Sequence, residues 1–123
     1  MLGVIVLAHG SRDPDWRRPV EAVAAEVRHR APQTLAACAY LELSEPGLAD
    51  CANHLIAQGA TELRILPAFI GMGRHAREDL PVLVEALRER HPGIHISCLP
   101  AAGEHPRLTR LLASIALEGA VPP

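Results

Sequence analysis

Two histidines and one glutamate stand where predicted strands end. His9 comes directly after an apolar run, Glu42 ends a second one, and His75 follows a third. Because the carboxyl ends of parallel strands meet at one edge of a sheet, we expect these three side chains at the same edge. Two imidazoles and a carboxylate form a ligand set that suits a borderline divalent ion such as Co²⁺, Fe²⁺, Ni²⁺ or Zn²⁺. Imidazole also titrates near neutral pH, so the same histidines can carry protons.

Three arginines stand in the same loops. Arg12 belongs to the loop after the first apolar run, and Arg74 and Arg77 belong to the loop after the third. A guanidinium binds a carboxylate through two parallel hydrogen bonds, so these side chains are candidates for holding an anionic ligand, with an ordinary solvated charge as the alternative. In the later loop, Gly73 lets the backbone pass close to a bulky ligand.

The residue sets that several other kinds of catalytic or binding site need are absent or incomplete. All 12 basic residues are arginine, which excludes a Schiff-base lysine and the lysine of a phosphate-binding P-loop. Ser11 with His75 as its base lacks a third triad member, and the sequence has no Gly-x-Ser-x-Gly nucleophile elbow. The stretch Gly-Met-Gly-Arg-His differs from the Gly-x-Gly-x-x-Gly of dinucleotide sites. We therefore expect no organic cofactor.

Apolar runs and amphipathic stretches alternate along the chain. Buried strands are predicted over residues 3–8, 35–42, 62–69 and 94–99. Apolar residues at helical spacing predict helices that begin near Asp15, at Ser44–Pro46, at Asp79–Pro81 and at His105–Pro106, the last with the stripe Leu108, Leu111, Leu112 and Ile115. This alternation is typical of a parallel sheet with right-handed crossovers.

We therefore expect an α/β fold with three layers, in which helices cover both faces of a four-stranded parallel sheet, similar to half of a flavodoxin fold. In the strand order 2-1-3-4, the ligand crevice lies between the first and third strands, beside His9 and His75. The 123 residues, 49% of them hydrophobic, are enough for a single domain over residues 1–123.

Composition and charge exclude several classes of partner. A net charge of −2 and an aromatic content of 2% provide neither a basic field nor a stacking platform, so we expect no nucleic acid and no membrane as partner. The apolar run at the N-terminus, about six residues, is too short for a signal peptide or a membrane span. Three widely spaced cysteines form no disulfide framework and are typical of small buried side chains in a reducing cytoplasm: Cys38, Cys51 and Cys98. We also expect a frayed end over residues 121–123.

Three stretches carry a family likeness. In their order and spacing, VIVLAHGSRDP, YLELSEPGLADC and LPAFIGMGRHAREDLP resemble the small class II chelatases of the CbiX/SirB type, which are sirohydrochlorin cobalto- and ferrochelatases with nickel-inserting relatives. The likeness covers most of the chain and includes a Gly-x-His-Pro stretch near the last helix. It implies a chelatase-like fold, with His9 and His75 as paired active-site histidines and Glu42 as the assisting carboxylate.

The resemblance also implies the substrates. The divalent metal, Co²⁺, Fe²⁺ or Ni²⁺, is then itself a substrate, bound by His9, His75 and Glu42. The other substrate is a carboxylate-rich tetrapyrrole, whose expected binding residues are Ser11, Arg12, Gly73, Arg74 and Arg77. Which of the three metal-site residues is the ligand and which is the base stays open, and the alternative function is a non-catalytic carrier of metal or tetrapyrrole with the same fold.

Larger members of this family hold two such domains in one chain and close the tetrapyrrole between them. One domain supplies one wall for a flat ligand. We therefore expect a homodimer whose two-fold interface presents two strand edges to a shared cleft.

Overall fold

The computed structural model describes residues 1–119, so the predicted fraying of residues 121–123 lies outside the described part of the chain. It contains one parallel sheet of four strands in the order β2-β1-β3-β4, which confirms the predicted order. The strands are β1 (Leu2–Ala8), β2 (Leu35–Tyr40), β3 (Glu62–Pro67) and β4 (His95–Cys98). The helices are η1 (Pro14–Arg17), α1 (Arg18–Arg30), α2 (Leu48–Ala57), α3 (Arg74–Arg90), η2 (Ala102–Glu104) and α4 (Pro106–Leu117), where η marks a 3₁₀ helix.

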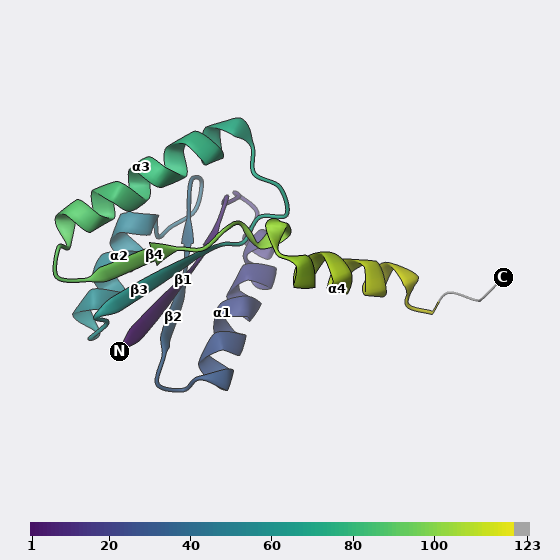
Figure 1. The fold of residues 1–123 in the computed structure, drawn as a ribbon, viewed down its shortest axis with the longest axis horizontal. Helices are drawn as coiled ribbons and strands as arrows, with labels where there is room; N and C mark the ends of the chain where they lie inside the picture. The colour runs from purple at the N-terminus through teal and green to yellow at the C-terminus, as the bar shows by residue number, and fades with distance from the viewer. Residues whose placement is uncertain (120–123) are drawn as a thin grey trace.

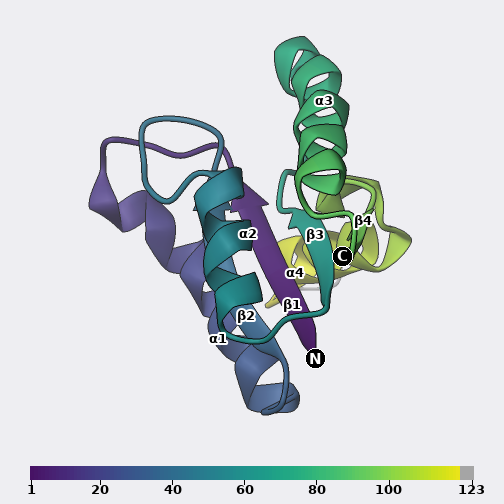
Figure 2. The same cartoon turned by 90° about the vertical axis from the view of Figure 1, so that its left-hand side faces the viewer.

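The sheet has helices on both faces (Figure 1). Successive side chains of a strand point to opposite faces, so Val6 packs under α1 whereas Ile5 and Leu7 lie in the core beneath α2 and α3. Figure 2 shows α2 and α3 on the side of the sheet opposite α1. This arrangement confirms the α/β class and the layers of helix, sheet and helix.

The second long helix begins later than the sequence predicted, and the third begins earlier. The second was expected from Ser44–Pro46 but begins at Leu48, and the third was expected from Asp79–Pro81 but begins at Arg74. Proline was interpreted as a first-turn residue in both cases, whereas the residues that precede the two helices are glycines with extended backbone, Gly47 and Gly73. Pro81 therefore lies inside α3, and His75 lies in the first turn of that helix rather than in a loop.

The last helix forms where it was predicted, but its apolar stripe is not part of the core. None of the residues of α4 is buried, and Leu111 and Ile115 are each 54% exposed. Figure 1 shows α4 pointing away from the sheet. The chain after β4 is tied to the loop after β3, because the Gly103 N–H donates to the Phe69 carbonyl oxygen at 2.8 Å. This contact directs α4 outward.

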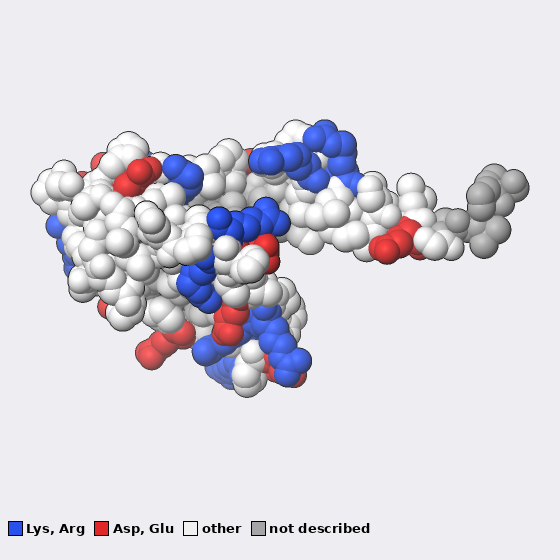
Figure 3. Space-filling model, turned by 90° about the horizontal axis from the view of Figure 1, so that it is seen from below, with Lys and Arg blue, Asp and Glu red and all other residues white. Residues whose placement is uncertain are grey.

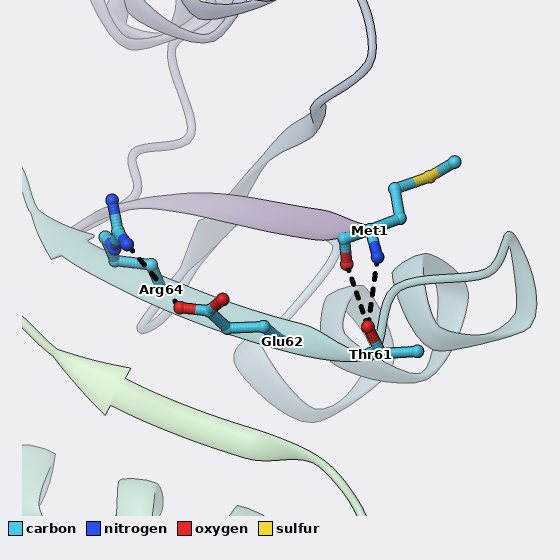
Figure 4. Close-up of polar contacts among 4 residues, drawn as sticks. All are labelled: Met1, Thr61, Glu62 and Arg64. Carbon is cyan, nitrogen blue, oxygen red and sulfur yellow. Dashed lines mark hydrogen bonds and ion pairs between the residues drawn. The ribbon is translucent and has the colours of Figure 1, made fainter.

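The first strand is anchored at its start. The ammonium group of Met1 donates to Thr61 Oγ1 at 3.0 Å, just before β3 begins (Figure 4). Within residues 1–119, no helix has the length and apolar character needed to cross a bilayer.

Candidate functional site

His9 directly follows β1 and is exposed, and its ring rests on an aromatic side chain. The ring centroids of His9 and Phe69 are 4.8 Å apart, with 43° between the ring planes. Phe69 is only 5% exposed and lies in the loop between β3 and α3. Because β1 and β3 are neighbours in the sheet, this loop reaches the end of β1 and holds the His9 ring from one side.

The segment around Glu42 is held beside His9 by a backbone hydrogen bond. The Glu42 N–H donates to the His9 carbonyl oxygen at 2.9 Å. Between them Gly10 has φ +99°, and a Cβ atom there would overlap the Glu42 carbonyl. The close approach of the two backbones therefore requires glycine at position 10. It holds the Glu42 backbone beside His9, and the Glu42 side chain is exposed.

Two serines join the loop after β1 to the loop after β2. The Ser44 hydroxyl donates to the Ser11 carbonyl oxygen at 2.7 Å and accepts the Ser11 N–H at 3.2 Å. The Ser11 hydroxyl accepts the N–H of Asp13 at 3.0 Å, so its side chain supports the turn that follows. The hydroxyl proton of Ser11 remains available to a ligand.

The loop between β3 and α3 brings the third candidate to this edge of the sheet. His75 is exposed in the first turn of α3, six residues after Phe69. Figure 1 shows that the segments after β1 and β2 and the segment leading to α3 lie at the same end of the sheet. The end of the sheet where β1, β2 and β3 finish therefore also holds the start of α3, on which His75 lies.

The predicted substrate-binding arginines have different surroundings. Arg12 is exposed, and Arg74 pairs with Glu78 at 3.2 Å between Nε and Oε1, with both side chains open to solvent. Arg77 lines an apolar groove of about 360 Å³ between α3 and β4, together with Leu80 and Cys98. An exposed ion pair such as that of Arg74 contributes little to stability, so this guanidinium can exchange its partner for a ligand carboxylate at small cost.

The residues predicted to bind the metal do not form a closed centre within one chain. Among residues 1–119, no group of three or more His, Cys, Asp or Glu side chains is placed to hold an ion. His9, Glu42 and His75 are brought to one edge, but as separate exposed groups. Such a set suits an ion that arrives and leaves with a substrate better than one that is permanently bound.

The three cysteines are free and poorly suited to metal binding as thiolates. Burial raises the pKa of Cys51 to about 12, and burial is also the largest cause of the raised pKa values of Cys38 and Cys98. Since a thiolate is the form that binds metals, these protonated side chains act as small apolar groups. Cys51 is buried as expected, whereas the other two are only partly buried.

Two residues of the site were not predicted from the sequence. Phe69 was interpreted as the end of a strand, and Ser44 as the start of a helix. The contact of Phe69 with His9 and the bonds of Ser44 to Ser11 join positions far apart in the chain. A signal for Phe69 was present, because it is one of only three aromatic residues, counting Phe, Trp and Tyr, and it lies two residues beyond the last residue of β3.

The chain resembles one family along almost its whole length. Residues 3–118 match the family model described as CbiX. The sirohydrochlorin cobaltochelatase of Methanococcus aeolicus is 30% identical over 84 residues, which are 68% of this chain and 59% of the relative. That of Saccharolobus islandicus strain L.S.2.15 is 33% identical over 84 residues, 68% of this chain and 64% of the relative. The matches thus span less than two thirds of these relatives.

Solved structures show the same fold. A CbiX protein from Marinobacter aquaeolei VT8, assigned to cobalamin (vitamin B12) biosynthesis, superposes with a TM-score of 0.82 at 34% identity, and the match covers 96% of each chain. The cobalt complex of the sirohydrochlorin chelatase SirB from Bacillus subtilis subspecies spizizenii superposes with a TM-score of 0.79 at 22% identity. That match covers 97% of this chain and 51% of SirB, so the present fold corresponds to about half of the larger chain.

Proposed function

This chain belongs to the CbiX family, and from that premise we propose that it is a chelatase that inserts Co²⁺, Fe²⁺ or Ni²⁺ into a sirohydrochlorin-type tetrapyrrole. The observation that carries the proposal is the meeting of His9, Glu42 and the loop before His75 at one edge of the sheet. The names of the two sirohydrochlorin cobaltochelatases support the choice of substrate.

The reaction needs groups that bind a metal and groups that accept protons. Insertion replaces the pyrrole N–H protons by the metal and strips water from the ion. In the proposal, neutral His9 and His75 bind the ion on one face of the macrocycle or accept a proton from it, and Glu42 binds the ion or carries the proton away. The Phe69 ring keeps the His9 imidazole at the sheet edge, where its nitrogens meet the substrate.

The carboxylates of the tetrapyrrole need partners at its rim. We assign this role to residues around the three metal-site residues: Ser11, Arg12, Gly73, Arg74 and Arg77. The exposed guanidiniums supply paired N–H donors, and Gly73 keeps the approach to α3 free of a side chain. The proposal further comprises a single domain over residues 1–123, a cytoplasmic location, a homodimer, and no organic cofactor.

A spectroscopic assay tests the activity. The purified protein is mixed anaerobically with sirohydrochlorin and each of the three metals, and the visible spectrum is followed. We expect acceleration over the spontaneous rate with at least one metal. Tight binding of tetrapyrrole without acceleration would instead indicate a carrier, and would overturn the enzyme proposal.

Substitutions at the site test the residue roles. We expect His9→Ala and His75→Ala each to lower the insertion rate by about 100-fold or more, because each removes a metal ligand or a proton acceptor. His29→Ala is a matched control, since His29 is exposed on α1 away from the loops described above. Full activity of a folded His9→Ala or His75→Ala variant would refute the site.

A further inference from the structure

The loop after β2 holds one residue in a strained conformation. Leu43 has φ +61°, in the left-handed region that residues with a side chain rarely adopt. The N–H of Ser44 donates to the Glu42 carbonyl oxygen at 2.7 Å, so Leu43 is the central residue of a three-residue turn. Such a turn with positive φ at its centre is rare and strained, whereas glycine adopts this φ without steric cost. Within residues 1–119, Leu43 is the only residue other than glycine with a positive φ.

Packing does not explain the leucine. The Leu43 side chain is 56% exposed, and it is not among the residues packed in either hydrophobic core. Exposure alone marks no site, since Figure 3 shows wide surface areas without Lys, Arg, Asp or Glu. Leu43 differs because its backbone is strained and no buried contact of its side chain compensates. Strained residues of this kind gather at sites where they serve a function.

The loop around Leu43 is held in place at several points. The Leu41 N–H donates to the Ala8 carbonyl oxygen at 3.0 Å, and the Tyr40 N–H donates to the Pro46 carbonyl oxygen at 2.9 Å, which closes the loop. The two serine hydrogen bonds described above join it to the loop after β1. These contacts impose the conformation of Leu43 and fix the direction in which its Cα–Cβ bond leaves the backbone.

A second exposed aliphatic residue lies in the loop after β3. Ile70 is 74% exposed, although the preceding Phe69 is buried. The Gly103 N–H donates to the Phe69 carbonyl oxygen at 2.8 Å, and a Cβ atom on Gly103 would overlap the Ile70 carbonyl. The backbone of Ile70 is therefore fixed by this close approach, while its side chain is open to solvent.

Leu43 and Ile70 belong to the loops on either side of His9. The strands β2 and β3 are both neighbours of β1, which ends just before His9. Leu43 directly follows Glu42, whose N–H bonds to the His9 carbonyl oxygen. Ile70 directly follows Phe69, whose ring contacts the His9 ring. Neighbouring strands are about 4.8 Å apart, so the ends of β2 and β3 are separated by about 10 Å, which is similar to the width of the flat core of a tetrapyrrole.

We propose that Leu43 and Ile70 bind the apolar face of the macrocycle and position it over His9. This inference rests on the proposed function and adds the part of the substrate that it left unassigned. The arginines meet carboxylates at the rim, whereas the conjugated ring system needs apolar partners. Because both backbones are fixed before the substrate arrives, little ordering is required on binding. Contacts with the ring face act equally before and during metal insertion, so they raise affinity rather than turnover.

The first experiment replaces the strained leucine by glycine. Leu43→Gly removes the side chain and suits φ +61°, so we expect an unchanged or higher melting temperature. The dissociation constant for metal-free sirohydrochlorin should rise about 10-fold, because an apolar contact is lost. Quenching of the tetrapyrrole fluorescence measures this constant without any metal. Unchanged affinity, or a melting temperature that falls, would show that the leucine serves the fold and would overturn the proposal.

The second experiment compares two exposed aliphatic residues. Ile70→Ser should also raise the dissociation constant about 10-fold. Val82→Ser is the matched control, because Val82 is 67% exposed on α3 and lies outside the loops after β1, β2 and β3, and it should keep the native affinity. In the chelatase assay, Leu43→Gly and Ile70→Ser should raise KM and leave kcat near the native value. Equal affinities of the Ile70 and Val82 variants would overturn the proposal.

The outcomes for this inference and for the proposed function are distinct. A native chain that binds sirohydrochlorin without inserting metal refutes the enzyme, while the measured affinities of the variants still support the inference. A native chain that inserts metal, with Leu43→Gly and Ile70→Ser binding as tightly as the native chain, refutes the inference alone. A native chain that does not bind the tetrapyrrole refutes both. A change of mass by light scattering at unchanged affinity would assign the two residues to a contact between chains and overturn the inference.

Discussion

At the scale of single residues, the position of the His9 ring depends on one aromatic neighbour. Phe69 is almost fully buried and meets the exposed imidazole with 4.8 Å between ring centroids. We predict that Phe69→Leu leaves the fold intact at a cost of about 1 kcal/mol, because leucine keeps most of the apolar contacts. The ring-current shift on the His9 imidazole protons should disappear, as measured by NMR.

The other histidines serve as internal controls for this substitution. The imidazole protons of His75 and His29 should keep their chemical shifts in Phe69→Leu. Unchanged His9 shifts would contradict the contact. In the chelatase assay, the variant is expected to lower turnover more than substrate affinity, since it disturbs the direction of a reacting group rather than the rim contacts.

The buried thiol of Cys51 makes stability depend on pH. Its pKa in the folded protein is about 12, above the ordinary 9.0, because burial disfavours the thiolate. Above pH 9 the unfolded chain loses this proton before the folded chain does, so the free energy of unfolding falls as pH rises towards 12. We predict that the native chain loses stability in this range by up to about 1.4 kcal/mol per pH unit more than Cys51→Ala. Urea denaturation of both proteins from pH 7 to 11 measures the difference, and parallel curves would refute it.

At the scale of elements, the contact between the loops after β1 and β2 depends on a single glycine. Gly10 combines φ +99° with a backbone approach to Glu42 that leaves no room for a Cβ atom. We predict that Gly10→Ala lowers the free energy of unfolding by about 1–3 kcal/mol, because the left-handed conformation and the overlap are both strained. Gly71→Ala is the matched control, since no atom lies within 4 Å of its added Cβ, and it should change stability by less than about 0.5 kcal/mol. Equal effects of the two substitutions, measured by urea denaturation, would contradict the close approach.

The elements themselves were largely predictable from the sequence because they depend on local patterns. The place of each strand followed from four apolar runs, the strand order was that of the expected flavodoxin-like fold, and Pro67 was correctly expected near the end of its strand. The starts of α2 and α3 were wrong because the sequence does not distinguish a proline in the first turn from one that precedes the helix, as Pro46 does, or lies inside it, as Pro81 does. Only the backbone at Gly47 and Gly73 distinguishes them.

The residue types of the candidate site were predictable from the sequence, but the contacts that hold these residues in position were not. His9, Glu42 and His75 were placed at one edge because parallel strands share their carboxyl ends. Phe69 and Ser44 were missed because their contacts join segments distant in sequence, and no periodicity encodes such contacts. The outward direction of α4 was missed for the same reason, since the contact of Gly103 with Phe69 sets it.

At the scale of the whole molecule, the fold corresponds to about half of the SirB chain. The helix α4 has no buried residue, and His9, Glu42 and His75 are exposed side chains at one end of the sheet. The N–H of Gly103, just before α4, donates to the Phe69 carbonyl oxygen, and the Phe69 ring contacts the His9 ring. The start of α4 and the predicted site are thus connected through one short segment.

If the proposed homodimer supplies part of the stability, the melting temperature must depend on protein concentration, since a dimer that unfolds to monomers is favoured by mass action. We predict that a tenfold increase in concentration raises the melting temperature of the native chain by about 2–5 °C. Leu111→Glu with Leu112→Glu places two charges on the exposed apolar stripe of α4. If this stripe contributes to the dimer, the variant should melt at a lower temperature that does not change with concentration. Arg110→Glu should keep the dependence, because its side chain lies off the apolar stripe of Leu108, Leu111, Leu112 and Ile115. Calorimetry over a hundredfold range of concentration separates the cases, and a native melting temperature that stays constant would show that each chain folds and is stabilised alone.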